Sequence, residues 1–280
     1  MTELVFLKLG GSLITDKTQP YTVRLDKLSE LSKEIRQGLA SMPNLRLVLG
    51  HGSGSFGHYA VKEYLTPLQL LPNSASFGSA SQNLGGEKGA RGFTEVWYRA
   101  SQLNRYVMES LHEAGMPAMA IQPSAGIVSK NGIVENWELA PLEAALKEGI
   151  VPVVYGDMAF DEVKGGAVLS TETLMFYLAH QLKPSRILLA GIEAAVWADF
   201  PVRKQKVEKI TPVSYKELAN KVGGSQSVDV TGGMKSKVEE MLALVKEIPN
   251  LKVQIFSGEE AGNTEKALRG AEIGTMITAE

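Results

Sequence analysis

Three side chains that can donate hydrogen bonds to an anion lie beside two glycine-rich turns. Lys8 stands in an apolar run just before Gly10-Gly11-Ser12, Lys17 follows a few residues later, and His58 ends a second turn that begins at His51. Glycine lets the backbone approach an anion closely, and the N-terminus of a helix adds a favourable dipole. Two such turns with cationic side chains around them predict a site that holds several phosphate groups, as a phosphoryl-transfer enzyme requires.

Lys8 and His58 each have a plainer interpretation beside the functional one. A lysine within an apolar run is costly unless it meets a counter-charge, so Lys8 either points at phosphate or lies exposed at a sheet edge. His58 is expected in the first turn of a helix, where it is either a simple polar residue or a donor that stabilises charge in a transition state. We expect His51 to hold its turn through the ring nitrogens and assign no function to His112 or His180.

Two further segments have the composition of functional turns. Tyr155-Gly156-Asp157 follows an apolar run, and a carboxylate at the C-terminal end of a strand in an open α/β sheet often has a function. Asp157 would orient a lysine or a metal, or merely form the turn. The segment 229–237 (DVTGGMKSK) places Lys235 and Lys237 in the first turn of a helix, where the dipole disfavours cations. A phosphate partner would explain these lysines.

Two common nucleotide-binding fingerprints do not account for these turns. The P-loop pattern GxxxxGK[ST] does not occur in the chain. Gly52, Gly54 and Gly57 have the spacing of a GxGxxG dinucleotide-binding fingerprint, but that match alone is weak.

The elements that must position these residues alternate between strands and helices. Such alternation predicts βαβ units and therefore a three-layer αβα fold of the α/β class, in which helices cover both faces of a central, mainly parallel sheet. Two small hairpins are expected at the rim, at 126–134 and 159–169. The expected strands are 4–9, 45–49, 118–122, 150–155, 186–190 and 252–256, and the expected helices are 24–41, 55–64, 91–114, 139–147, 170–181, 235–246 and 263–269.

The composition favours a soluble protein. The 280 residues suffice for two lobes, and a net charge of −2 gives no electrostatic case for a nucleic-acid partner. The absence of cysteine excludes disulfides, zinc–thiolate sites and thiol nucleophiles. We see no signal-peptide pattern and no apolar run that approaches the length of a bilayer span, so we expect a cytoplasmic protein with no membrane partner.

A boundary between two lobes is expected near 167–172, where the second hairpin ends and a helix opens. It divides the chain into residues 1–168 and 169–280. The segment 73–90 is rich in Gly, Ser, Ala and Asn, and is either a surface loop or a flap that orders over a substrate. A second irregular segment, 222–227, reads as a linker.

Together the motifs resemble those of the amino acid kinase superfamily and, within it, the isopentenyl phosphate kinase family. The resemblance covers nearly the whole chain and rests on 8–17 (KLGGSLITDK), 51–58 (HGSGSFGH), 151–157 (VPVVYGD) and 229–237. It implies transfer of phosphate from ATP, with Mg²⁺, to isopentenyl phosphate, a step of isoprenoid biosynthesis. It also implies an amino acid kinase-like fold, acceptor binding in 1–168, nucleotide binding in 169–280, and a homodimer formed through the N-terminal lobe.

The same resemblance assigns roles to individual residues. Lys8 and Lys17 would hold the ATP phosphates and the transferring group, and His58 would bind the acceptor phosphate. Either Lys235 or Lys237 would contact the nucleotide, and the spacing leaves this choice open. We assign no protein ligand to the metal. The other expected substrate contacts are Gly10, Gly11, Ser53, Gly54, Gly57, Gly156 and Asp157, and the other expected nucleotide contacts are Gly10, Ser12, Gly191 and Gly233.

An isopentenyl chain requires a dry apolar pocket. Phe93 and Val96 fall on one helical face at spacing i, i+3. With Met158 and Val168 from the second hairpin they would line this pocket, and the alternative is that all four belong to an ordinary core.

Two segments of the nucleotide half depart from the family pattern. The usual Thr-Asp-x-Asp-Gly-x-Tyr is replaced by 190–197 (AGIEAAVW), and the usual Ser-Gly-Asp-Asp by 170–173 (STET). These changes leave the nucleotide preference open. Trp197 either stacks on a base or packs as a buried indole.

Two other functions compete with this interpretation. A related small phosphate or phosphonate kinase, such as a fosfomycin-type resistance kinase, would have a polar tail pocket, which Phe93, Val96 and Met158 argue against. A non-catalytic nucleotide sensor would explain the altered 190–197 segment. A sensor has no need, however, of a transfer apparatus such as Lys8, Lys17 and His58.

Overall fold

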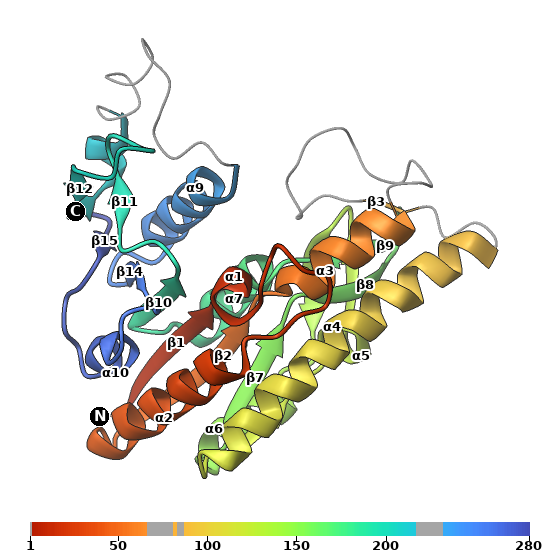
Figure 1. Ribbon diagram of the computed structural model, residues 1–280, viewed down its shortest axis with the longest axis horizontal. Helices are drawn as coiled ribbons and strands as arrows, with labels where there is room; N and C mark the ends of the chain where they lie inside the picture. The colour runs from red at the N-terminus through yellow and green to blue at the C-terminus, as the bar shows by residue number, and fades with distance from the viewer. Residues whose placement is uncertain (1, 66–80, 83–86, 217–231) are drawn as a thin grey trace.

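A central eight-stranded sheet organises the chain in the computed structural model, which describes residues 2–65, 81–82, 87–216 and 232–280 (Figure 1). The strand order is β13-β15-β14-β10-β1-β2-β7-β4, and every neighbouring pair is parallel except β14–β15. The predicted mainly parallel sheet is therefore confirmed. Its strands are β1 (Glu3–Leu9), β2 (Leu45–His51), β4 (Ala118–Ala120), β7 (Val151–Tyr155), β10 (Arg186–Gly191), β13 (Lys209–Ile210), β14 (Lys252–Ser257) and β15 (Thr275–Ile277).

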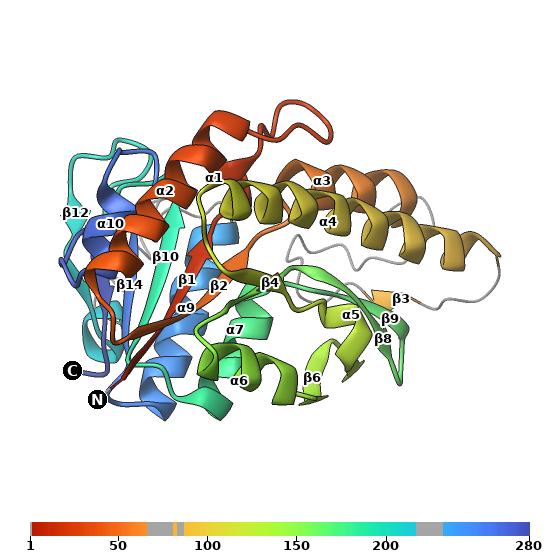
Figure 2. The same ribbon diagram turned by 90° about the horizontal axis from the view of Figure 1, so that it is seen from below.

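Helices cover both faces of this sheet, which confirms the predicted three layers. Figure 2 shows helices both above and below the sheet. One face is covered by α2 (Leu25–Ser41), α4 (Glu87–Glu113) and α10 (Asn263–Leu268), and the other by α6 (Ala140–Lys147), α7 (Thr171–Leu182) and α9 (Gly232–Glu247). In the described part of the chain, no helix is long and apolar enough to cross a bilayer.

The side chains of β1 alternate between the two faces of the sheet, and this alternation determines the face on which Lys8 lies. Val5, Leu7 and Leu9 pack with α2, α4 and α10, whereas Phe6 packs on the opposite face with α7 and α9. Successive side chains of a strand alternate between faces. Lys8 therefore shares the face of Phe6, and it is buried at the end of a central strand rather than exposed at a sheet edge.

The two predicted hairpins do not stand apart at the rim. They join through the parallel pair β5–β8 into a second sheet with the order β3-β9-β8-β5-β6. Asn131 and Gly132 both have positive φ and close the first hairpin, and Asp161 accepts a hydrogen bond from the Gly132 amide at 2.7 Å. The strands are β3 (Ser81–Gln82), β5 (Ile127–Lys130), β6 (Ile133–Trp137), β8 (Asp157–Asp161) and β9 (Gly165–Leu169).

Several short elements were not predicted. The expected helix 55–64 is α3 (Gly54–Ala60), which continues into a π-helical turn, η1 (Val61–Leu65). The strands β3, β13 and β15 were not predicted either, and neither were α1 (Gly11–Ile14), α5 (Pro123–Gly126), β11 (Val196–Trp197) and β12 (Lys206–Val207).

Parts of the chain on which sequence predictions were made lie outside the described residues. The predicted loop or flap at 73–90 falls largely in this category, because the structure describes only Ser81–Gln82, which form β3, and residues 87–90, which begin α4. The linker at 222–227 and the turn at 229–231 also lie outside the described residues.

Candidate active site

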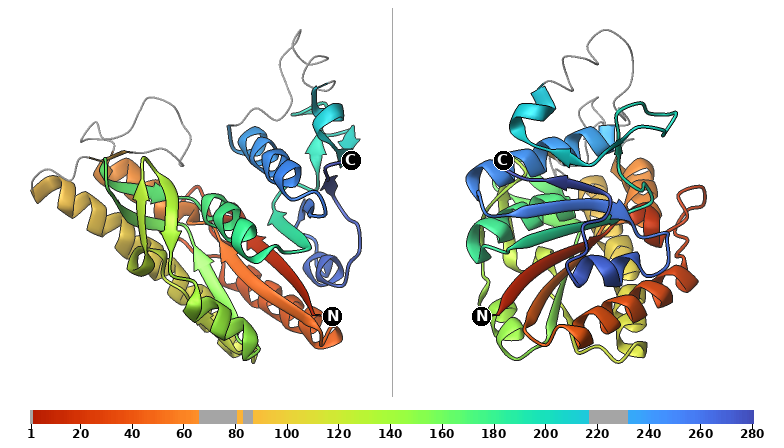
Figure 3. Two further views of the ribbon diagram at one scale, coloured as in Figure 1. Left: turned by 180° about the vertical axis from the view of Figure 1, so that it is seen from behind. Right: turned by 90° about the vertical axis from the view of Figure 1, so that its left-hand side faces the viewer.

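A cleft of about 610 Å³ lies at the C-terminal ends of β1, β2, β7 and β10. Ligands of open α/β sheets bind at this edge. Figure 3 shows α9 on one side of the strand ends, and α4 with the second sheet on the other side. Most of the predicted site residues line the cleft: Lys8, Gly10, Gly11, Ser12, Lys17, Ser53, Gly54, Gly57, His58, Val96, Gly156, Asp157, Val168, Gly191 and Lys237.

The two glycine turns interlock at the floor of the cleft. The Gly10 amide donates to the Ala190 carbonyl at 2.8 Å, which fixes the turn after β1 to the end of β10. A Cβ atom on Gly11 would lie 2.6 Å from the Gly54 Cα atom, and Gly54 itself has a φ of +49°. Both positions therefore require glycine, because a side chain would push the turns apart or strain the backbone.

His58 and His51 lie on the same glycine-rich segment but have different surroundings. His58 belongs to α3 and lines the cleft, where burial and then the nearby Lys17 lower its pKa to about 4. The imidazole is therefore neutral at pH 7 and keeps one N–H to donate.

His51 is fully buried at the end of β2. Its Nδ1 donates to the Gly52 carbonyl at 3.1 Å, its Nε2 accepts from Asn104 at 3.1 Å, and its ring stacks on Tyr155. These contacts fit the structural role expected for it.

Three lysines from three elements face the cleft. Lys8 is the penultimate residue of β1, Lys17 follows α1, and Lys237 belongs to α9. Burial and the charge of Lys8 lower the pKa of Lys17 and of Lys237. The three ammonium groups repel one another, and bound phosphate groups would offset this repulsion with negative charge.

Glu172, in the first turn of α7, is the ion-pair partner of Lys8. Burial alone would raise its pKa, but the charges of Lys8 and Lys237 lower it to about 2. Glu240 lines the cleft one helical turn beyond Lys237; partial burial of its carboxyl group and the nearby Glu172 raise its pKa to about 7. Sequence reasoning missed both carboxylates, and noted Glu172 only as a departure from the family pattern.

The structure distinguishes the two lysines between which the sequence could not choose. Lys237 lines the cleft, whereas the side chain of Lys235 is half exposed and lies 4.0 Å from Glu239 on the outer surface of α9. Two residues of helix correspond to a rotation of about 200°, so the two lysines cannot both face the cleft. For Gly233, in the first turn of α9, the structure describes only the helical backbone.

The apolar end of the cleft differs from the prediction in two residues. Val96 and Val168 line it together with Val61 and Ala100. Phe93 and Met158 do not line it: both are buried in the same apolar cluster as Val61 and Val96, and Phe93 stacks on Phe160 with ring centroids 4.9 Å apart. They lie behind the lining residues, where Met158 shares the cluster with Val96 and Phe93 packs on Phe160 of β8.

Asp157 is held by backbone groups. Its carboxylate accepts hydrogen bonds from the Ser124 amide at 3.1 Å and from the Met158 amide at 2.9 Å, and burial raises its pKa to about 6. The prediction that it orients a lysine or a metal finds no support in these contacts, which stabilise the start of α5.

In residues 169–280, Gly191, Ile192 and Glu193 line the cleft and Trp197 does not. The indole N–H of Trp197 donates to Glu193 at 3.1 Å, and Arg203 donates to the same carboxylate from two nitrogens at 2.7 and 2.9 Å. Of the two alternatives left open for Trp197, stacking on a base is not supported by this position.

Comparisons with known proteins agree with this geometry. A family model described as the amino acid kinase family matches residues 3–257. An isopentenyl phosphate kinase from Methanocaldococcus jannaschii is 32% identical over 278 residues, which cover 98% of each chain, and one from Haloferax volcanii is 35% identical over 243 residues, which cover 86% of this chain and 88% of the relative. A crystal structure of isopentenyl phosphate kinase superposes with a TM-score of 0.78 at 29% identity and covers 99% of this chain and 100% of the other.

Proposed function

This chain belongs to the amino acid kinase family, and we propose that it is a kinase that transfers the terminal phosphoryl group of ATP to isopentenyl phosphate. One observation of the structure carries the proposal. A single cleft joins three lysines and two glycine turns, which suit phosphate groups, to an apolar end lined by Val61, Val96, Ala100 and Val168. A phosphate with a short hydrocarbon tail matches both ends.

The chemistry needs positioning and charge neutralisation more than covalent catalysis. Lys8, Lys17 and Lys237 neutralise the phosphate oxygens of donor and acceptor. The amides of the Gly10–Gly11 and Ser53–Gly54 turns approach the same oxygens, since glycine leaves their backbone accessible. Glu172 holds the Lys8 ammonium in place through their ion pair.

His58 acts as a neutral donor toward the acceptor phosphate. Its lowered pKa keeps the imidazole uncharged at physiological pH, and it still has one N–H for a phosphate oxygen. Negative charge that develops in the transition state strengthens this hydrogen bond. An oxygen of the acceptor phosphate is already ionised at neutral pH, so the transfer needs no strong general base.

The two parts of the chain divide the substrates. Residues 1–168 contribute His58, Lys17 and the apolar end, and so hold the acceptor. Residues 169–280 contribute Gly191, Glu193 and Lys237, and so hold the nucleotide. Lys8 and the Gly10–Gly11 turn lie between these groups, where the phosphoryl group passes.

Magnesium enters this proposal as the ion that accompanies ATP. In kinase sites Mg²⁺ is held by substrate phosphates with one or two carboxylates, and it neutralises charge on those phosphates. The cleft fits such an ion, because Glu172 and Glu240 supply carboxylate oxygens that repel each other. Within the described ranges no group of three or more His, Cys, Asp or Glu side chains could hold a metal by itself.

We further propose that the enzyme is cytoplasmic and pairs as a homodimer through its N-terminal half. Val128 and Phe160 support the pairing, because they are neighbours on the second sheet beside α4 and are both more than half exposed. Light scattering coupled to size-exclusion chromatography would measure twice the chain mass of 30.2 kDa; a monomer at micromolar concentration would count against the pairing.

Phosphorus NMR of a mixture with Mg-ATP and isopentenyl phosphate tests the proposed reaction. We expect the monophosphate signal to be replaced by those of a diphosphate ester as ADP accumulates. Release of inorganic phosphate with isopentenyl phosphate unchanged would contradict the proposal, as would no reaction. The Lys8→Ala variant, in which the signals should stay unchanged, controls for contaminating kinases.

A further inference from the structure

We propose that Arg24, oriented by Glu259, is a positioning residue for phosphoryl transfer. It fixes the C-terminal end of α1 and through it the Gly10–Gly11 turn at the floor of the cleft. This inference rests on the proposed kinase function. Neither residue lines the cleft, so the effect on the reaction is transmitted through α1.

The helix α1 requires outside support. It has four residues, and an isolated helix of that length is not stable in water. The last carbonyl groups of any helix also lack partners within the helix. Arg24 satisfies two of them: its Nη1 donates to the Leu13 carbonyl at 3.0 Å, and its backbone amide donates to the Ile14 carbonyl at 2.9 Å.

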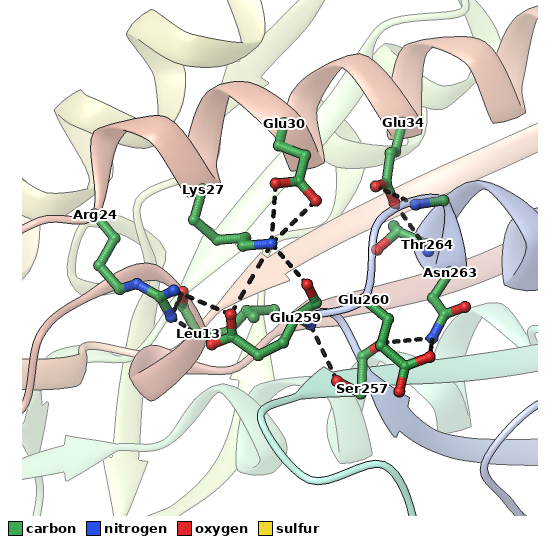
Figure 4. A network of polar contacts seen from close by, with 11 residues as sticks. Leu13, Arg24, Lys27, Glu30, Glu34, Ser257, Glu259, Glu260, Asn263 and Thr264 are labelled. Atoms are coloured by element: carbon green, nitrogen blue, oxygen red, sulfur yellow. Dashed lines mark hydrogen bonds and ion pairs between the residues drawn. The ribbon is translucent and has the colours of Figure 1, made fainter.

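Glu259 holds the Arg24 guanidinium in the orientation that reaches Leu13. Nη1 of Arg24 contacts Oε1 of Glu259, and Nη2 donates to Oε2 at 3.0 Å, so the two groups meet as a fork (Figure 4). The backbone of Glu259 is fixed as well. Its amide donates to the Ser257 hydroxyl at 3.1 Å, and its carbonyl accepts from the Lys27 ammonium at 3.0 Å.

The segment that carries Glu259 touches both walls of the cleft. The Gly258 amide donates to the Gly191 carbonyl at 2.8 Å. A Cβ atom on Gly258 would lie 2.6 Å from a methyl carbon of Leu13, so this segment packs directly on α1. Leu13 and Gly191 both line the cleft. The Arg24–Glu259 pair therefore connects the phosphate-facing turn with the nucleotide wall.

The same polar network contains a part that only supports the fold. Glu34, further along α2, accepts hydrogen bonds from the Gly262 and Thr264 amides at 2.6 and 3.0 Å and so caps α10 (Figure 4). It makes no contact with α1 among the described hydrogen bonds. Glu34→Gln is thus a matched control: it weakens the network without moving the turn.

The exposure of the Arg24–Glu259 pair predicts a small effect on folding stability and a larger effect on the reaction rate. About a third of each side chain of Arg24 and Glu259 is exposed, and pairs at this exposure add little to folding stability. A displacement of about 1 Å at a reacting group, in contrast, can cost roughly 100-fold in rate. Loss of the pair should therefore lower kcat more than it lowers the melting temperature.

The test compares Arg24→Ala, Arg24→Lys, Glu259→Gln and Glu34→Gln. For each we would measure kcat, the KM of both substrates, ADP affinity by calorimetry and the melting temperature. We expect Arg24→Ala to lower kcat by roughly 10- to 100-fold while the KM for isopentenyl phosphate stays within about threefold. Arg24→Lys and Glu259→Gln should fall between it and wild type, because each keeps one half of the interaction. Glu34→Gln should lower the melting temperature and leave kcat within about threefold.

Two results would overturn the inference. One is a folded Arg24→Ala protein with kcat within threefold of wild type. The other is an equal loss of kcat in Glu34→Gln, which would make Arg24 merely structural. If wild type itself fails to turn over isopentenyl phosphate, the proposed function fails, and ADP affinity then decides the inference. Arg24→Ala should bind ADP about fivefold or more weakly and Glu34→Gln should not; equal affinities would reject it.

Discussion

Lys8 at the end of β1 and Glu172 in the first turn of α7 form an ion pair on the floor of the cleft, although 164 positions separate them in the chain. Both side chains are largely buried, so the pair is not weakened by solvent as a surface pair would be. The carboxylate holds the ammonium at the point where Lys17 and Lys237 also converge. A residue of α7 thus fixes a lysine that the strand β1 supplies.

Lys237 and Lys235 provide a matched pair of substitutions two residues apart on α9. We expect Lys237→Ala to lower kcat/KM for ATP by about 100-fold or more, because an ammonium that neutralises transition-state charge is lost. Lys235→Ala should stay within about threefold of wild type, since that side chain is half exposed beside Glu239. Steady-state kinetics with varied ATP measures both. Equal losses in the two variants would show that the orientation of α9 assigned here is wrong.

His58→Ala should lower kcat by about two to four orders of magnitude if the imidazole stabilises charge in the transition state. His112→Ala is the control, because His112 is exposed on α4 away from the cleft. The measurement is kcat at saturating concentrations of both substrates. Activity of His58→Ala within tenfold of wild type would exclude this role.

Val96→Ala should widen the apolar end of the cleft and shift preference toward longer prenyl phosphates. We expect kcat/KM for geranyl phosphate relative to isopentenyl phosphate to rise roughly tenfold. Phe93→Ala should shift the ratio less, because Phe93 lies in the wall behind the cleft. Val107→Ala is the control, since Val107 is equally buried on α4 but belongs to the core on the sheet. An unchanged ratio in Val96→Ala would refute the position assigned to the tail.

Acid should destabilise the protein through His51. Burial lowers its folded-state pKa to about 4 from the usual 6.5, so below pH 6.5 the unfolded chain binds a proton that the folded chain refuses. The contribution of His51 to the free energy of unfolding is therefore complete above pH 6.5. It falls by about 3 kcal/mol as the pH drops toward 4. Urea unfolding of wild type and His51→Gln at pH 7 and pH 4 measures this loss of unfolding free energy. The loss should be smaller in His51→Gln by about that amount, and equal losses would contradict this account.

The long elements could be predicted from the sequence because buried elements have characteristic patterns of apolar residues. Central parallel strands are buried on both faces, so β1, β2 and β10 appear as continuous apolar runs. Elements such as α1 and β15 could not be found in this way. The first has four residues and the second three, and their stability comes from contacts with residues outside the element, such as Arg24 and Ala190 for α1 and β14 for β15.

The candidate site was predictable where glycine marks a close approach of two turns, as at Gly11 and Gly54. The choice between Lys235 and Lys237 required the rotation of α9 about its axis, which packing sets. Phe93 was misplaced for the same reason, because its orientation on α4 depends on Phe160 in the second sheet. Glu172 carried no signal of its own, since an acidic residue in the first turn of a helix is ordinary.

The most direct test is an ADP-release assay with Mg-ATP in which isopentenyl phosphate, dimethylallyl phosphate and fosfomycin are compared side by side. We predict turnover of isopentenyl phosphate with a kcat/KM of roughly 10⁴ M⁻¹s⁻¹ or more, and a far lower value for fosfomycin, whose polar body does not match Val61, Val96 and Val168. A preference for fosfomycin would contradict the substrate assignment. No turnover of any acceptor by a protein that binds ATP would contradict the kinase itself and favour a nucleotide sensor.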